Sequence, residues 1–453
     1  MGKGLKQTRA GRQPVKRRAA TPERVERKSF RTAFLEPFRP LLEQIDAARQ
    51  VNVYPFYPCV EPRSPSNGSA EARQEIVLVA NDYLGLGMDG RVRDAAREAI
   101  ARLGTSRCAS PLAGGYTALH RTIEARLAAF LGQEAVALFA SGYQANVGII
   151  SALMLRGDLI VTDLFNHASI VDGARLSGAD VRVFQHNSPT HLRRVLEQHA
   201  KGRRALVIVE GIYSADGDIV CLPEICAVAH AHRALVMVDE AHSLGVLGQA
   251  GAGAAEHFGC LHEVDLIMGT MSKSLASVGG FIAADRHLVE VIRHNARSLI
   301  FSAALPPAGV AAALVALEIL QAEPQRRERL WHNARRMVGG LRTQGFDTMR
   351  SETPVIPILV GDPVRTLEFT ARLRDRGVLV CPAIPPMVQG HLSRIRAHVT
   401  AAHDDATIDA ALTIIGDVAA AIGFHEHRPR RQPTALADAV LSAPRPVSPA
   451  SPR

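Results

Sequence analysis

The sequence predicts an α/β protein with a large, mostly parallel sheet, followed by a smaller α+β domain. Between residues 136 and 283, short apolar runs bounded by Gly or polar residues recur, and helical stretches separate several of them. Such runs are typical of parallel strands buried on both faces of a sheet. Polar residues close many of the runs, as expected for a site at the carboxyl ends of strands. The expected strands are 136–139, 159–162, 181–184, 205–209, 235–238, 266–268 and 280–283.

The second domain is expected after a long alanine-rich helix that starts near Pro307. Beyond this helix, residues 355–360 and 378–380 are apolar runs that we expect to form strands. A chain of 453 residues can bury one large and one smaller core. Both ends are rich in Pro, Arg and small residues, which is typical of disordered tails. The expected division is a basic tail (1–30), an N-terminal helix or arm (31–75), a large domain (76–310), a small domain (311–427) and a C-terminal tail (428–453).

The net charge of +9 lies at the N-terminus. Residues 1–31 contain eleven Lys or Arg and two Glu, so the remainder of the chain is neutral. A basic tail of this kind is typically a solvated arm. The alternative is an arm that contacts a membrane surface or a partner protein. A nucleic-acid-binding protein would need positive charge on its folded body, so we expect no nucleic acid partner.

Membrane-spanning, secreted and metal-binding classes are not favoured by the sequence. No run of about 18 apolar residues occurs, and the N-terminal segment lacks the apolar stretch of a signal peptide. The six cysteines have neither a CxxC pair nor the spacing of a zinc site, so we expect reduced thiols and no metal. We therefore expect a cytoplasmic protein, with peripheral contact at the inner membrane as the alternative.

An amphipathic helix is predicted over residues 28–50. We expect its apolar face to pack on protein, such as a neighbouring subunit, with lipid as the alternative. The apolar residues that recur there at helical spacing are Phe30, Phe34, Phe38, Leu41, Leu42 and Ile45.

The segment MVDEAHSLGVLG (237–248) contains the first candidate pair. An apolar strand ends at Asp239, and His242 follows three residues later. A carboxylate at this position can form an ion pair with a protonated ring nitrogen. The letters DEAH also occur in helicases, but those enzymes need a GxxxxGKS/T phosphate loop, which this sequence lacks.

The segment DLIMGTMSKSLASVGGF (265–281) places a lysine among hydroxyls and glycines after a buried strand. Thr270 and Ser272 precede Lys273 there, and Gly279 and Gly280 follow. Hydroxyls and backbone amides can hold a phosphate, whereas a desolvated amine loses its proton and becomes nucleophilic. A solvated loop lysine is the alternative for this segment taken alone.

Two further turns each carry a weaker signal. Ser141, Gly142 and Tyr143 lie between a strand and a helix, so the helix N-terminus could bind the same phosphate. His167 precedes another helix, and its imidazole could stack on a planar cofactor or be structural.

Taken together, these segments resemble the α-oxoamine synthase family of fold-type I enzymes that depend on pyridoxal 5'-phosphate (PLP). They appear in family order over about 320 residues, and the combination is more specific than any one motif. The matching segments are ANDYLGL (80–86), SGYQAN (141–146), NHASI (166–170), EGIYSADGD (210–218), VDEAHSLGVLG (238–248), GTMSKSLASVGGF (269–281), FSAALPP (301–307) and SRIRAHVTAAH (393–403).

The resemblance implies an aspartate aminotransferase-like fold and a role for each matching residue around PLP. Lys273 would bind the cofactor covalently and later move the Cα proton. Asp239 would pair with the pyridinium nitrogen, which makes the ring an electron sink. His242 and Ser214 would lie near the phenolic oxygen, and His167 would stack on the ring.

The resemblance also implies a homodimer with a shared active site. Ser302 would reach the cofactor phosphate from the partner subunit. Arg396 would clamp the carboxylate of the amino acid in a two-pronged contact, with Asn81 nearby and Arg394 as its rival. Tyr143 departs from the family, where Phe is common, and either ring should serve. On the same subunit, the phosphate would meet Ser141, Gly142, Tyr143, Thr270 and Ser272.

Members of this family join an amino acid to an acyl thioester with loss of CO₂. The SKS around Lys273, the IFSAALPP run and YPFYP (54–58) are most similar to bacterial serine palmitoyltransferases. We therefore expect L-serine and a long-chain acyl-CoA. The alternatives are a specialised-metabolite synthase that takes its acyl group from a carrier protein and a biotin-pathway, 8-amino-7-oxononanoate synthase-like enzyme.

Two other classes share the fold. A non-catalytic subunit would not require Lys273, Asp239 and His242 together. A plain aminotransferase would release no CO₂ during turnover.

Overall fold

The computed structural model describes residues 30–51, 53–58, 75–385 and 387–427. The two predicted tails lie outside these residues, apart from Phe30. By its internal contacts, the chain forms two compact units, Met1–Phe56 and Tyr57–Arg453.

The N-terminal unit contains the helix that its spacing predicts. Residues 30–35 are helical, a 3-10 turn follows at Glu36–Phe38, and α2 covers Arg39–Gln50. Pro37 and Pro40 are the second residues of the turn and of α2, where the N–H that proline lacks has no partner within the helix. No residue of α2 is buried, and the surface that its apolar face contacts stays a prediction.

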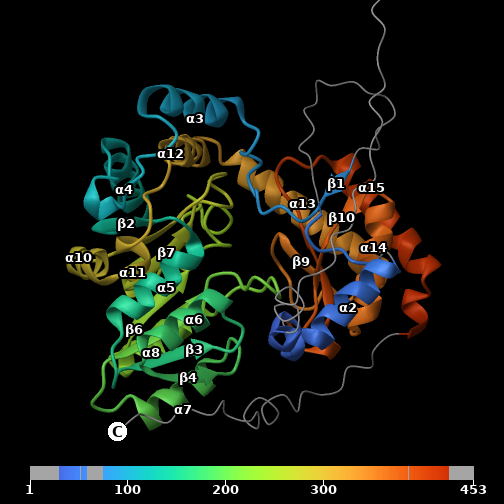
Figure 1. The fold of residues 1–453 in the computed structure, drawn as a ribbon, viewed down its shortest axis with the longest axis horizontal. Helices are drawn as coiled ribbons and strands as arrows, with labels where there is room; N and C mark the ends of the chain where they lie inside the picture. Colours follow the sequence, from blue (N-terminus) through green and yellow to red (C-terminus); the bar gives the residue numbers. More distant parts are fainter. Residues whose placement is uncertain (1–29, 52, 59–74, 386, 428–453) are drawn as a thin grey trace, which may run out of the picture. The chain divides into compact units, whose positions relative to one another are not determined.

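The centre of the second unit is a seven-stranded sheet with the order β2-β8-β7-β6-β5-β3-β4 (Figure 1). Strand β8 is antiparallel to both neighbours, and the other pairs are parallel. The strands are β2 (Ala135–Phe139), β3 (Leu159–Asp163), β4 (Asp180–Phe184), β5 (Ala205–Glu210), β6 (Leu235–Asp239), β7 (Leu266–Thr270) and β8 (Gly280–Ala284). All seven predicted strands are thus present, in a mostly parallel sheet.

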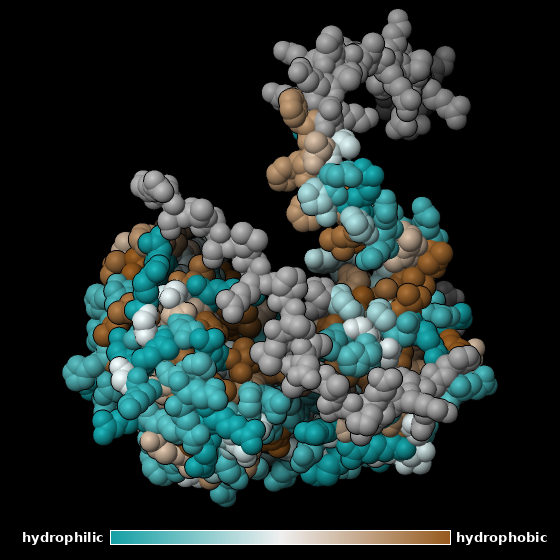
Figure 2. All heavy atoms as spheres, turned by 90° about the horizontal axis from the view of Figure 1, so that it is seen from below, coloured by the Kyte–Doolittle hydropathy of each residue, from teal (hydrophilic) through white to brown (hydrophobic). Residues whose placement is uncertain are grey.

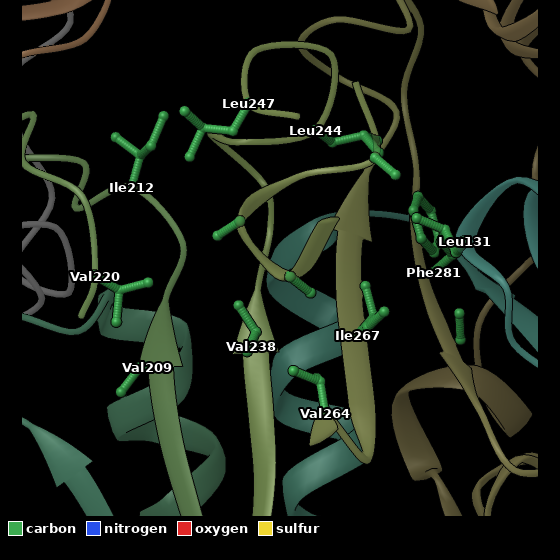
Figure 3. Close-up of a cluster of buried hydrophobic side chains, with 14 of the residues drawn as sticks. Leu131, Val209, Ile212, Val220, Val238, Leu244, Leu247, Val264, Ile267 and Phe281 are labelled. Atoms are coloured by element: carbon green, nitrogen blue, oxygen red, sulfur yellow. The ribbon is translucent and has the colours of Figure 1, made fainter. Parts of the chain in front are cut away.

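Helices cover both faces of this sheet, so alternate residues of each strand enter two different cores. On β6, for example, Val236 and Val238 lie in one core and Met237 in the other. Figure 3 shows the first core, where Val209, Val238 and Ile267 come from adjacent strands. The helices are α3 (Gly90–Leu103), α4 (Ala118–Leu131), α5 (Gly142–Leu153), α6 (Ala168–Ser177), α7 (Pro189–His199), α8 (Leu222–Ala231), α9 (Ala254–His257), α10 (Arg286–Asn295), α11 (Arg297–Ile300) and α12 (Pro307–Ala322).

A third core lies around two smaller sheets. One has the order β11-β12-β9, and the other pairs β1 with β10. Strands β9 (Val355–Leu359) and β10 (Val378–Leu379) confirm the two predicted runs, whereas β1 (Ile76–Val77), β11 (Cys381–Ala383) and β12 (Arg394–His398) were not expected. The covering helices are α13 (Gln325–Thr343), α14 (Pro363–Asp375) and α15 (Asp405–Ala421).

The division at residues 76 and 310 stays a prediction, because both sheet regions belong to one compact unit. Ile76 lies in the third core and not in the core of the large sheet.

The face drawn in Figure 2 carries polar and apolar residues side by side. Within the described ranges, no helix is both long and apolar enough to cross a membrane.

Candidate active site

The carboxyl ends of four strands place the predicted residues at one edge of the large sheet. Strands β3, β5, β6 and β7 are neighbours in the sheet and each is parallel to the next. Their carboxyl ends therefore lie at the same edge. His167 follows β3, Ser214 follows β5, His242 follows β6 and Lys273 follows β7. Residues that are up to about a hundred positions apart in sequence are therefore brought together by the order of the strands.

Asp239 is the last residue of β6 and is held as a buried hydrogen-bond acceptor. Its side chain is nearly inaccessible, and its Oδ1 accepts the backbone N–H of Ala241 at 2.9 Å. The side-chain amide of Asn146 donates to its Oδ2 at 2.8 Å. Donors on both oxygens hold the Asp239 carboxylate in one orientation.

Lys273 has an amine that is partly deprotonated near neutral pH. Burial lowers its pKa to about 8, against the opposing effect of the Asp239 and Glu210 carboxylates. Glu210 lies beside Asp239 in the register of β5 and β6, and burial and that neighbouring carboxylate raise its pKa to about 8. The site therefore holds a partly unprotonated amine within electrostatic reach of two carboxyl groups, Asp239 and Glu210.

His167 caps α6 and is itself exposed. It joins a hydrogen-bond network whose other members are buried, and the sequence motifs did not reveal this network. Its Nδ1 lies 2.7 Å from Ser169 Oγ, which in turn accepts from Asn146 Nδ2 at 2.9 Å. Because Asn146 also binds Asp239, this network joins two of the predicted residues. Burial lowers the pKa of the His167 imidazole, so it is neutral.

His242 is buried and pairs with a tyrosine. Its Nδ1 lies 2.7 Å from the Tyr83 hydroxyl, and that hydroxyl lies 3.5 Å from Asn81 Oδ1. Burial, together with the charge of Lys273, lowers the pKa of His242, whereas burial raises the pKa of Tyr83. Tyr83 therefore links Asn81 to His242. Tyr83 lies in the ANDYLGL segment, but its contact with His242 was not predicted from the sequence.

Strand β12 carries both arginines on one face, and the structure distinguishes them. Arg394 is 2% exposed and binds Asp216 Oδ1 at 2.7 Å, and its Nε donates to the backbone of Leu392. Arg396 donates through Nη1 to the backbone oxygen of Ser214 at 2.8 Å. Its buried Nε has no partner among the described residues. Arg396 therefore retains a donor for an anionic ligand, whereas Arg394 is occupied by an internal ion pair.

His398 is the third basic residue on this face of β12. Neither of its ring nitrogens has a hydrogen-bond partner within the described part of the chain, although the residue is buried. Burial and the charge of Arg396 lower its pKa to about 3, so the imidazole is neutral.

The glycine-rich turns after β2 and β7 lie against each other. A Cβ on Gly142 would approach Thr270 Oγ1 to 3.1 Å, and a Cβ on Gly280 would meet the backbone of Ser141 at 2.6 Å. Thr270 Oγ1 lies 2.8 Å from Ser272 Oγ. The hydroxyls of Thr270 and Ser272 thus lie close to the N-terminus of α5, and both kinds of group can bind an anion.

Tyr143 and Ser302 lie in different surroundings from the residues above. Tyr143 is 45% exposed and its hydroxyl binds Asp172, while its ring centroid lies 6.3 Å from that of His167. Ser302 lines a cavity of about 300 Å³ together with Glu124 and Arg293, and Lys273 is not part of this lining. A contribution of Ser302 from a partner subunit stays a prediction.

These residues fit PLP, which needs a nucleophilic amine, a carboxylate and an anion-binding turn around one planar ring. The amine of Lys273, which is partly buried, and the buried carboxylate of Asp239 lie at the same sheet edge as the turn at Gly142. No group of three or more His, Cys, Asp or Glu residues within the described ranges could hold a metal ion.

Comparison with known proteins identifies the family. Residues 73–415 match the model of aminotransferase class I and II. The chain is 40% identical over 371 residues to 8-amino-7-oxononanoate synthase of Thermoanaerobacter pseudethanolicus, which covers 82% of this chain and 94% of that one. It is also 40% identical over 368 residues to serine palmitoyltransferase of Sphingobacterium spiritivorum, which covers 81% and 92%.

Among solved structures, one of serine palmitoyltransferase with PLP matches with a TM-score of 0.82 and 34% identity. The match covers 86% of this chain and 99% of that one. The family model, both relatives and this solved structure all point to one family and one fold. The chain therefore belongs to the α-oxoamine synthase family of fold-type I transferases and is a PLP-dependent enzyme.

Proposed function

We propose that the enzyme condenses L-serine with a long-chain acyl-CoA. The Cα of serine forms a bond to the acyl carbon, the carboxyl group leaves as CO₂, and the thiol of CoA is released. The product is an α-amino ketone of the 3-ketosphinganine type. The observation that carries this proposal is the arrangement of Lys273, Asp239 and Arg396 around one edge of the sheet.

Lys273 would hold PLP and transfer the Cα proton. Its pKa of about 8 leaves part of the amine unprotonated at neutral pH, as a base and a nucleophile must be. PLP, when bound, supplies an electron sink for the pair of electrons that the departing Cα proton leaves behind. Asp239 would balance the positive charge of the pyridinium ring, because its carboxylate is buried and held by two N–H donors.

Arg396 would bind the carboxylate of the amino acid, with Asn81 nearby. The support is its buried Nε without a described partner, since a carboxylate can accept from Nε and Nη2 together. The contact from Nη1 to the backbone of Ser214 holds the guanidinium in place. Arg394 would not take this role, because Asp216 already neutralises it.

The remaining roles concern the orientation of PLP. His167 would lie against the ring, and His242 and Ser214 would lie near the phenolic oxygen. We propose a homodimer in which Ser302 of one subunit completes the phosphate site of the other. The residues proposed for the phosphate within one subunit are Ser141, Gly142, Tyr143, Thr270 and Ser272.

The choice of serine and a long acyl chain is supported by the motifs around Lys273 and by the match to serine palmitoyltransferase structures over 86% of the chain. A second candidate is an 8-amino-7-oxononanoate synthase-like reaction, with another amino acid or an acyl group on a carrier protein. It is supported by a relative that is equally identical at 40%. Both candidates use the same chemistry at Cα and differ in the amino acid or in the acyl donor.

A matrix of substrates separates the two candidates. The purified holoenzyme is incubated with L-serine, L-alanine or glycine, each against a short acyl-CoA, pimeloyl-CoA and palmitoyl-CoA, and thiol and CO₂ release are measured. Serine with palmitoyl-CoA should give the highest kcat/KM. A preference for alanine with pimeloyl-CoA would replace the first candidate by the second. Thiol release without CO₂ would contradict both.

A further inference from the structure

The side-chain amide of Asn146 lies between two of the groups proposed to contact PLP. The residue is 1% exposed and is part of α5. Its two amide hydrogens serve Asp239 Oδ2 at 2.8 Å and Ser169 Oγ at 2.9 Å. A carboxylate can only accept, so Nδ2 and not Oδ1 must face Asp239. The orientation of the amide is therefore determined by the charge of Asp239.

Ser169 carries the effect of this amide to His167. Since its Oγ accepts from Asn146, its own hydrogen is available for His167 Nδ1 at 2.7 Å. The backbone N–H of Ser169 also points to Nδ1, at 3.3 Å. A ring nitrogen that receives two donors is unprotonated, so the hydrogen of the neutral imidazole lies on Nε2. Burial lowers the pKa of His167 more than Asp239 raises it, in agreement with a neutral ring.

The approach of α5 and α6 makes this network possible. Gly173 lies one turn after Ser169 on α6, and a Cβ at this glycine would come within 2.9 Å of the backbone oxygen of Asn146 and 3.1 Å of Val147 Cα. Only a residue without a side chain lets the two backbones come this close. Ser169 can therefore reach Asn146 directly.

We propose that Asn146 is a positioning residue that controls both Asp239 and His167. Its amide holds the Asp239 carboxylate in a fixed orientation, and through Ser169 it holds His167 in the Nε2–H tautomer. This inference rests on the roles proposed above for Asp239 and His167 toward PLP. It does not depend on which amino acid or acyl thioester is the substrate.

The test measures the dissociation constant of PLP from the apo-protein of four variants. Asn146→Ala removes both contacts, Ser169→Ala removes only the branch to His167, and Asp239→Asn removes the charge itself. The matched control is Asn333→Ala, because Asn333 is equally buried and donates to the backbone of Thr400 and His403, both at 2.8 Å. The pH dependence of the visible absorbance of bound PLP is recorded for each variant that binds it.

Loss of a hydrogen bond to a charged group should weaken PLP binding by about 10- to 100-fold in Asn146→Ala. It should also change the pH profile of the visible band, because the Asp239 carboxylate has lost the side-chain donor that orients it. Ser169→Ala should change the dissociation constant by about threefold or less while lowering kcat, and Asn333→Ala should leave PLP affinity within about twofold of the parent.

Two results would overturn the proposal in different ways. Equal PLP affinity in Asn146→Ala and Asn333→Ala, with weakened binding in Asp239→Asn, refutes the role of Asn146 alone. Unchanged affinity in Asp239→Asn refutes the proposed role of Asp239 itself and, with it, the inference.

Discussion

His186 lies in a buried cluster with two carboxylates, and we expect it to make stability depend on pH. Its Nδ1 lies 2.9 Å from Asp163 Oδ1 and its Nε2 lies 2.9 Å from Asp218 Oδ2. Carboxylates only accept, so both ring nitrogens must carry hydrogens and the imidazolium is charged. Phe165 stacks on one side of the ring at 4.3 Å between centroids.

The size of the effect follows from the change in pKa. Burial acts to lower the pKa of His186, but the hydrogen bonds to Asp163 and Asp218 outweigh it and raise the pKa from 6.5 to about 10. Such a shift corresponds to on the order of 5 kcal/mol between the two protonation states. Because the folded pKa is above the unfolded one, the contribution is complete below about pH 6.5. It is lost as pH rises through about 10.

The double variant His186→Gln, Asp218→Asn removes this contribution without leaving two carboxylates face to face. The urea midpoint of the apo-protein is measured for both proteins between pH 6.5 and 9.5. The parent should be more stable at pH 6.5, and the difference should shrink steadily toward pH 9.5. His287→Gln serves as the control, because its side chain is 94% exposed. A difference that stays constant or grows with pH would refute the charged-histidine argument.

Two further predictions concern the proposed catalytic groups. Lys273→Ala should abolish turnover and the borohydride-trappable adduct with PLP, because the only other lysine among the described residues, Lys201, follows α7 and is exposed. Residual turnover at more than a thousandth of the parent rate would contradict this assignment. Arg396→Lys should raise the KM for the amino acid by about 10- to 100-fold with little change in melting temperature, because a point charge replaces a two-pronged contact. Arg394→Lys should instead lower the melting temperature, because it disturbs the buried pair with Asp216. A raised KM in Arg394→Lys together with a lowered melting temperature in Arg396→Lys would exchange the roles of the two arginines.

The seven strands of the large sheet could be predicted because both faces of the sheet are buried. Each strand is then a continuous apolar run, and such runs are visible without knowledge of their neighbours. Strand β12 gives no such signal, because Arg394, Arg396 and His398 occupy the face turned away from the third core. The alternation of these polar residues with Ile395 and Ala397 is instead the pattern of a half-buried strand, a signal that a search for continuous apolar runs misses.

The candidate site was predictable only where a residue belongs to a local motif. Lys273 and Asp239 each follow an apolar strand, so their positions at the sheet edge could be expected. Asn146 and Ser169 depend on contacts between helices and a strand, which no spacing reveals. The choice between Arg394 and Arg396 required Asp216, which lies 178 positions from Arg394 in the sequence. Residues two apart on a strand share a face, so spacing alone favours neither.

The pair between Arg394 and Asp216 also restricts how β12 can move. Both side chains are almost fully shielded from water, and the guanidinium is held in addition by Leu392 and by the backbone oxygen of Ala215 at 3.4 Å. Separating a shielded ion pair without new partners is costly, so β12 should travel with the loop that follows β5 as one rigid piece. Substrates would then enter by rotation of side chains and loops around this piece, and a hinge that opens between β12 and the large sheet is not expected.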